Sequence, residues 1–208
     1  MSILEYNGGS VVAMKGKDCV VIASDHRYGI RFQTISMNYP KIHRLNNKCF
    51  VGLTGLATDT QTIHERLKFR LQMYKLKEGR EMGPKVLSNV INSILYERRF
   101  GPYFVEPVVC GLEETDDGGI EPYIYAADLI GAGLYADDFV VAGTASEALY
   151  GLCESLYKPD MGPEETFEVV SQSLLAAVNR DAYSGWGASV YIIEKGKTTV
   201  RQIKGRVD

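Results

Sequence analysis

The sequence predicts an α+β fold in which two β-sheets pack face to face and a pair of helices covers each outer face. Apolar residues first follow the period of strands, then of two helices, then of strands, two helices and strands again. No linker, repeat or low-complexity tract divides the 208 residues, which favours one domain over 1–208. A four-layer αββα sandwich buries the apolar face of every one of these segments at once.

The N-terminal part is typical of short strands rich in branched and aromatic residues. Asn46-Asn47 is a hairpin signal between the last two of them. A turn at 15–18 separates the first two. The predicted strands span 10–14, 19–23, 32–37, 42–45 and 48–54.

Two helices are predicted next. Thr58 and Gln61 match a capping box, which would place the first turn of a helix directly after Thr58. Gly79 ends this helix, and Pro84 suits the first turn of the second. The buried stripes are expected at Ile63, Leu67, Leu71 and Tyr74 in the first helix and at Leu87, Ile91, Ile94 and Leu95 in the second.

The C-terminal half repeats this order. Strands are predicted at 104–112, 120–126 and 139–143, and the acidic stretch 113–119 between the first two is expected to be a solvated hairpin loop. Ser146 is predicted to cap a third helix, and a fourth follows Pro163. Their apolar stripes are Leu149, Leu152, Cys153 and Leu156, then Phe167, Val170, Leu174 and Val178. Strands at 189–194 and 198–203 close the chain.

The composition excludes several classes of partner. A net charge of -3 provides no basic field for nucleic acid or for an anionic membrane surface. The longest apolar runs are too short to cross a bilayer, and the first residues lack the basic and apolar regions of a secretory signal. We therefore expect no nucleic-acid partner and no membrane partner.

The four cysteines are widely spaced, mostly within apolar stretches, and form no CxxC or Cys/His cluster. This pattern favours buried thiols in a reducing compartment, with no metal site and no cofactor, and so the cytoplasm, the nucleus or both. The chain also has thirteen tyrosines and one tryptophan. Tyrosine is enriched where subunits meet, but ordinary half-buried strand positions explain the number equally well.

Three segments carry a family resemblance: 6–14, 19–25 with Lys41 sixteen positions after Asp25, and 180–185. They resemble the proteasome β-subunit family, whose catalytic members use an N-terminal threonine that self-cleavage after a glycine exposes. In register with that pattern, Gly9 stands at the position of the nucleophile. Glycine offers neither the hydroxyl nor the thiol that a base could deprotonate. The resemblance implies the N-terminal-nucleophile hydrolase fold, with residues 1–8 as a short N-terminal extension.

The resemblance also implies where the rest of a vestigial site lies. Asp25 and Lys41 match the pair that tunes the threonine, and Asp181 and Ser184 match a distal pair. Thr144 falls in the slot of a mid-chain serine. Gly55 matches the glycine whose backbone amide would form the oxyanion hole. Taken alone, Asp25 and Lys41 also fit a structural ion pair, and Asp181-x-x-Ser184 a simple turn.

A competing interpretation makes the chain an active peptidase in which cleavage between Gly9 and Ser10 exposes Ser10. The register argues against it, because Gly9 lies sixteen positions before Asp25 and Ser10 only fifteen. In an extended strand, a slip of one residue turns a side chain to the opposite face. We therefore expect the Ser10 hydroxyl to point away from Lys41.

The resemblance extends over essentially the whole chain, through segments such as 55–59, 67–71, 76–80, 96–103 and 137–143. It implies a non-catalytic subunit in one of the two seven-membered β rings of the 20S core. The implied partners are β type-2 and β type-4 neighbours, the opposite β ring and the α ring. The implied role is structural support of ubiquitin- and ATP-dependent protein degradation by the catalytic subunits.

Overall fold

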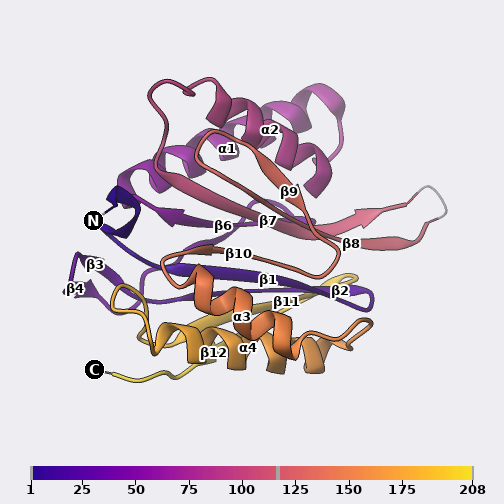
Figure 1. Cartoon of the computed structure of the whole chain (residues 1–208). Helices are drawn as coiled ribbons and strands as arrows, with labels where there is room; N and C mark the ends of the chain where they lie inside the picture. Colours follow the sequence, from indigo (N-terminus) through magenta and orange to yellow (C-terminus); the bar gives the residue numbers. More distant parts are fainter. Residues whose placement is uncertain (1, 116–117, 208) are drawn as a thin grey trace.

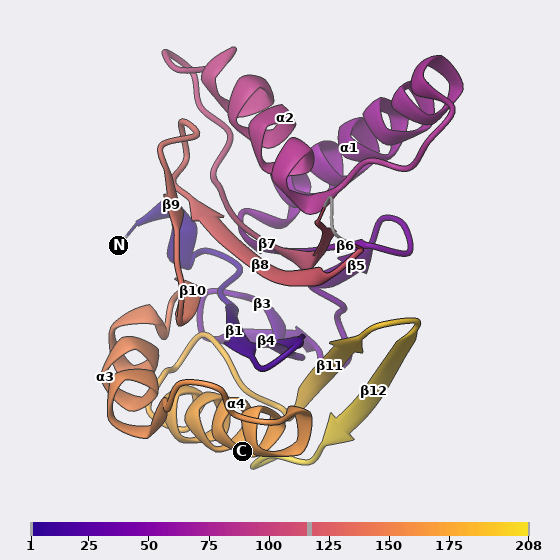
Figure 2. The same cartoon turned by 90° about the vertical axis from the view of Figure 1, so that its right-hand side faces the viewer.

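The computed structural model describes residues 2–115 and 118–207 and confirms the four-layer sandwich. Two five-stranded antiparallel sheets lie face to face in the middle of the molecule (Figure 1). Turning the molecule by 90° shows one pair of helices above the sheets and the other pair below them (Figure 2). The predicted order of strands and helices therefore gives the predicted layers.

The first sheet has the strand order β10-β1-β2-β11-β12. Its central strand is β2, and Val11 of β1 pairs with Ser24 of β2 on one side and with Ala142 of β10 on the other. The chain enters this sheet at its start and returns to it at its end. The strands are β1 (Ser10–Gly16), β2 (Cys19–Asp25), β10 (Phe139–Gly143), β11 (Ala188–Glu194) and β12 (Lys197–Ile203).

The second sheet has the order β5-β6-β7-β8-β9, and a separate hairpin, β3–β4, lies beside the sandwich. The pattern of the sequence did not predict β3 or β9, because each is only three residues long and partly or fully exposed. The strands are β3 (Tyr28–Ile30), β4 (Gln33–Ser36), β5 (Ile42–Arg44), β6 (Cys49–Gly55), β7 (Val105–Glu114), β8 (Ile120–Ala127) and β9 (Gly133–Tyr135).

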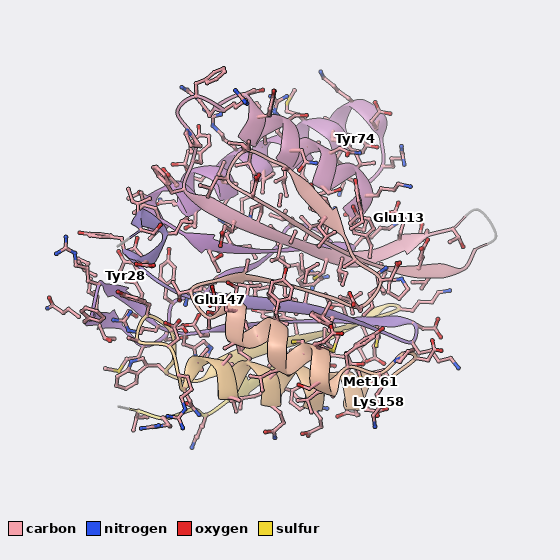
Figure 3. All side chains as sticks on the ribbon, in the orientation of Figure 1. Tyr28, Tyr74, Glu113, Glu147, Lys158 and Met161 are labelled. Carbon is pink, nitrogen blue, oxygen red and sulfur yellow. The ribbon has the colours of Figure 1, made fainter. Side chains whose placement is uncertain are left out.

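Side chains fill all three spaces between the layers (Figure 3). Neighbouring residues of one strand serve different spaces, because their side chains point to opposite faces. Val11 and Ile22 pack between the sheets with Phe50, whereas Val12 and Val21 pack toward the lower helices. Both faces of β1 and β2 are therefore buried, which explains why their sequences are almost continuously apolar.

The upper helices α1 (Ala57–Glu78) and α2 (Pro84–Tyr96) cover the second sheet, and α3 (Ser146–Leu156) and α4 (Pro163–Val178) cover the first. A short 3-10 turn, η1 (Ile3–Glu5), precedes them all. The predicted stripes are buried except at three margins. Tyr74 and Leu152 are half-buried, and Leu156 is 40% exposed.

Both predicted N-terminal caps are wrong. The N-cap of α1 is the apolar Leu56, and Thr58 lies inside the helix, where its carbonyl accepts a hydrogen bond from Thr62. The N-cap of α3 is Ala145, one residue before Ser146. In α1 the cause is that β6 runs almost directly into the helix, so the end of the strand sets the first turn. Gly79 does end α1 in the left-handed conformation, with φ of 69°.

The four cysteines are buried, with free thiols, as predicted. Burial raises the pKa of the Cys49 thiol to about 12, so this sulfur stays protonated. Eight of the thirteen tyrosines are half-buried and one is buried, which fits the interpretation as strand and helix-margin residues. Of the acidic loop, residues 113–115 and 118–119 are described, whereas Asp116 and Asp117 lie outside the described residues.

Candidate functional site

Five segments meet at one end of the sandwich and bring polar side chains into its interior. They are the start of β1, the end of β2, the residue before β5, the turn between β10 and α3, and the loop after α4. The hydrogen bonds join the predicted positions into two groups. We call them the Asp25 cluster (Asp25 and Lys41) and the Asp181 cluster (Thr144, Asp181 and Ser184).

Asp25 is fully buried at the end of β2, and its two carboxylate oxygens accept four hydrogen bonds or ionic contacts. Oδ1 accepts from the backbone N–H of Ser10 at 2.9 Å and lies 2.9 Å from Lys41 Nζ. Oδ2 accepts from the backbone N–H groups of Arg27 at 3.1 Å and Gly185 at 3.0 Å. A carboxylate offers about four acceptor sites, so this one is saturated.

Lys41 is 3% exposed, and the structure shows that it pairs with Asp25. Its Nζ also donates to the backbone carbonyls of Asp25 at 3.1 Å and of Arg27 at 2.7 Å. Burial lowers the pKa of Lys41, and the Asp25 charge opposes this shift. All three ammonium donors are thus engaged with fixed acceptors of the protein.

The Asp181 cluster is built from hydroxyl groups. Oδ2 of Asp181 accepts from Thr144 Oγ1 and from Ser184 Oγ, each at 2.5 Å. Oδ1 accepts from the backbone N–H of Tyr183 at 3.1 Å, so the loop after α4 also closes an Asx-type turn. Thr144 in turn donates its backbone N–H to the carbonyl of Gly9 at 3.0 Å. The structure therefore brings the distal pair and the mid-chain threonine to the predicted nucleophile position.

Gly9 lies between the two clusters in a conformation that favours glycine, with φ of 120°. A Cβ added here would lie 2.9 Å from Lys41 Cδ and closer still to Cε. The methylene chain of Lys41 therefore occupies the space into which a side chain at this position would extend. Position 9 supplies no side-chain atom that could act as a nucleophile, and the Lys41 methylene groups fill the space beside it.

Ser10 faces the other way, as the register predicts. Its Oγ accepts the backbone N–H of Ala145 at 3.1 Å and lies 3.5 Å from Ser184 Oγ. Its backbone N–H donates to Asp25 Oδ1 at 2.9 Å. The residue is fully buried, so its hydroxyl is committed to packing the turn before α3.

Gly55 ends β6, where it pairs with Val105 of β7. Its φ of 114° and the close approach of the Phe104 backbone, 3.0 Å from an added Cβ, require glycine here. The side-chain hydrogen bonds that form the Asp25 and Asp181 clusters involve other predicted positions and not Gly55. The oxyanion-hole role of Gly55 stays a prediction.

Sequence reasoning missed Arg27 and Asn7. Arg27 is 3% exposed and uses its guanidinium to hold Thr34 Oγ1 at 3.0 Å and the Tyr183 and Arg31 carbonyls at 3.0 Å and 2.9 Å. Burial lowers the pKa of Arg27. Asn7 joins the N-terminal extension to the body of the chain. The only signal in the sequence is position: each lies two residues from a predicted site residue.

Residues 2–115 and 118–207 offer neither a metal-binding cluster nor a membrane-spanning helix. No group of three or more His, Cys, Asp or Glu side chains in these residues could hold a metal ion. No helix formed by them is long and apolar enough to cross a membrane.

Comparison with known proteins gives one consistent result. Residues 5–193 match the family described as "Proteasome subunit". The full length of the chain aligns with the full length of relatives named "Proteasome subunit beta type-3". The chain is 57% identical to the protein from Drosophila melanogaster and 52% identical to that from Dictyostelium discoideum. It is 51% identical to "Proteasome subunit beta type-3-A" from Arabidopsis thaliana, again over the full length of both chains.

Proposed function

The chain belongs to the proteasome subunit family, and from this premise we propose that it is a non-catalytic structural β subunit of the 20S proteasome core. It assembles with other proteasome subunits and supports ubiquitin- and ATP-dependent protein degradation by the catalytic members of the ring. The observation that carries the proposal is Gly9, which replaces the nucleophile and is covered by Lys41. No threonine-type hydrolysis can begin at this position.

The retained polar residues have a structural use that explains their geometry without catalysis. The Asp25 cluster joins β1, β2 and the loop after α4, and the Asp181 cluster joins that loop to the turn before α3. A buried charge that loses its partner is strongly destabilising, so such a network persists after a reactive group is lost. On this view, Asp25, Lys41, Thr144, Asp181 and Ser184 hold the fold together.

The alternative function, an active peptidase that uses Ser10, is not favoured. Its hydroxyl accepts from the Ala145 amide on the side of β1 away from Lys41, and the described contacts of that hydroxyl include no base. The residue would also have to leave a fully buried position to meet a substrate. General-base activation needs a hydroxyl that the substrate can reach and that lies within hydrogen-bond distance of a base.

Exposed apolar residues support a role as a ring constituent. On α1, Phe69, Met73 and Leu76 recur at helical spacing and face away from the sheet; we call this the outer face of α1. Leu76 is 81% exposed, and Phe100, just beyond α2, is 92% exposed. Apolar surface of this kind is typical of a contact surface in an assembly. The partners that we propose are β type-2 and β type-4 neighbours, the opposite β ring and the α ring, in the cytoplasm and the nucleus.

Native mass spectrometry of the endogenous complex tests the proposal directly. We expect two copies of the subunit in each core particle, and an intact subunit mass that includes Gly9 with residues before it. An electrophilic inhibitor of threonine proteases should modify other β subunits and leave this one unmodified. An adduct on residue 9 or 10, or a chain that runs as a monomer in cell extracts, would contradict the proposal.

A further inference from the structure

A cavity of about 310 Å³ lies beside the Asp181 cluster, between the β3–β4 hairpin, the loop after α4 and the C-terminal residues 205–206. Figure 1 shows the hairpin and the C-terminus on the same side of the molecule. The volume is at the small end of the range for ligand pockets, so a ligand here would be no larger than a short peptide. The structural role that we propose for the chain assigns nothing to this cavity.

Arg27 brings a buried positive charge to the wall of the cavity. It is 3% exposed, and a guanidinium stays protonated in proteins. The ion pairs of the described residues do not include it. Asp25 and Asp181 act on it only from a distance, and Asp25 already pairs with Lys41. Because buried charges are normally paired, Arg27 is a cation that an anionic ligand could neutralise by direct contact.

The guanidinium also has donors that the described residues leave unused. Three of its five N–H groups are engaged, with Thr34 Oγ1 and with the carbonyls of Tyr183 and Arg31. One N–H on each Nη has no acceptor in the described part of the chain. Thr34, which accepts from Arg27 Nε at 3.0 Å, lines the cavity too, so this end of the arginine borders it. A carboxylate is the anion whose two oxygens match such N–H groups.

The rest of the wall favours a small zwitterion with an apolar side chain. Asp181 lines the cavity, and in its described contacts Oδ1 accepts a single N–H, that of Tyr183, so it retains an acceptor site for an ammonium group. The same negative charge disfavours phosphate and other dianions. Trp186 and Phe32 add aromatic surface. Trp186 has φ of 64°, a strained conformation for a bulky residue and one that is common at ligand-binding sites.

We infer that this cavity binds a short peptide with free termini: Arg27 holds the carboxylate, Asp181 receives the ammonium group, and the aromatic surface of the wall covers an apolar side chain. Binding uses no nucleophile and involves no covalent step. It depends on the cavity of this chain alone. Only the source of the peptides, which catalytic neighbours release as products, rests on the proposed function.

The fluorescence of Trp186, the single tryptophan of the chain, reports on the cavity directly. We expect glycyl-L-leucine to change the fluorescence of the purified full chain saturably, with a midpoint on the order of 1–10 mM. Glycyl-L-leucinamide lacks the carboxylate and should bind at least about tenfold more weakly, because the charge-assisted hydrogen bonds to Arg27 are lost. N-acetylglycyl-L-leucine lacks the ammonium group and should bind at least about threefold more weakly.

Arg27→Met should weaken the binding of glycyl-L-leucine at least about tenfold. The control is Arg180→Met, which removes an exposed guanidinium next in sequence to Asp181 but outside the cavity wall, and its midpoint should stay within about twofold of wild type.

Three results with the wild-type chain would overturn the inference, so the test does not require Arg27→Met to fold. One is no saturable change up to about 50 mM glycyl-L-leucine. Another is an equal midpoint for glycyl-L-leucine and its amide. The third is the same response to sodium phosphate at matched ionic strength, which would make the cavity a general anion site. None of them bears on the structural role of the subunit, because incorporation into the core is measured separately by native mass spectrometry.

Discussion

The Asp25 cluster and the outer face of α1 differ in how far their chemistry is satisfied within the chain. In the cluster, Asp25 and Lys41 are 0% and 3% exposed, and the carboxylate and ammonium groups are fully engaged with the chain. On α1, Phe69 and Leu76 are 61% and 81% exposed although both are apolar. Folding of the chain alone satisfies the polar groups of the Asp25 cluster. The apolar side chains on the outer face of α1 can be buried only by contact with another subunit.

Substitutions in the two regions should therefore change different measured properties. Changes in the Asp25 cluster should appear in the free energy of unfolding of the chain, since the cluster joins segments distant in sequence. Changes on the outer face of α1 should appear in assembly and leave folding almost unchanged. The predictions that follow begin with the Asp25 cluster and end with the outer face of α1, in order of decreasing expected effect on stability.

Asp25→Ala should have the largest effect. It leaves the Lys41 ammonium buried without its carboxylate and removes the acceptor of three backbone N–H groups. We expect a loss of about 3–5 kcal/mol in the free energy of unfolding, measured by urea denaturation of the purified chain. The matched control is Asp137→Ala, which breaks an exposed pair with Lys15 at 3.3 Å and should cost below about 1 kcal/mol. Equal losses in the two variants would show that the buried pair contributes no more to the free energy of unfolding than the exposed pair does.

Gly9→Ala should come next. The added Cβ overlaps the Lys41 side chain and forces a non-glycine residue to φ of 120°, so we expect a loss of about 2–4 kcal/mol. Gly79→Ala is the control, because Gly79 also has positive φ but its Cβ would meet no other described atom within 4 Å. Only the backbone cost of about 1–2 kcal/mol should remain there.

Gly9→Thr extends the same test to activity. It restores a hydroxyl at position 9 but not the space in front of Lys41, so hydrolysis of fluorogenic peptides by cores carrying it should not exceed the wild-type rate. Hydrolysis that rises and depends on Lys41 would show that only the missing side chain makes the site inert.

The pH dependence of stability probes the place where α1 meets the second sheet. His43 of β5 stacks on His64 of α1, with ring centroids 3.9 Å apart. Burial, with the nearby His64 and Lys68 charges, lowers the pKa of His43 to about 4. Because the folded pKa lies below the unfolded value of about 6.5, the unfolded chain binds the proton first as the pH falls. This contribution to stability is complete above about pH 6.5 and is lost progressively down to about pH 4.

The expected loss is about 1–2 kcal/mol, after allowance for the partial exposure of the ring. Urea denaturation at about pH 7 and about pH 4.5 measures it, and His43→Phe, which keeps the stacked ring, should reduce the difference. If wild type and His43→Phe lose the same stability between these two pH values, His43 is not the group responsible.

The sequence was sufficient for the layers because their signals are local and periodic. The apolar runs of β1 and β2 and the helical stripes of α1, α2 and α4 each depend on residues a few positions apart. The site positions came from a family resemblance and the spacing between Gly9, Asp25 and Lys41, and the structure shows that they meet. What these signals could not supply were bonds between distant segments.

Asn7 and Arg27 illustrate this limit. The Asn7 side chain contacts Ala57, fifty positions later, and Arg27 contacts Tyr183, 156 positions later. Neither residue type nor local spacing distinguishes them from surface residues. The caps of α1 and α3 failed for a related reason: an adjoining strand or turn, rather than a local capping residue, determines where each helix begins.

Leu76→Ser should have the smallest effect on folding and so tests the other half of the comparison. The side chain is 81% exposed, and we expect a change within about 0.5 kcal/mol in the free energy of unfolding. Leu67→Ala on the inner face of the same helix is the contrast: Leu67 is fully buried, and its truncation should cost about 2–5 kcal/mol. Incorporation into core particles, followed by native mass spectrometry, should fall for Leu76→Ser at unchanged chain stability. If Leu76→Ser destabilises the isolated chain as much as Leu67→Ala does, the outer face of α1 stabilises the chain itself and is not a contact surface for another subunit.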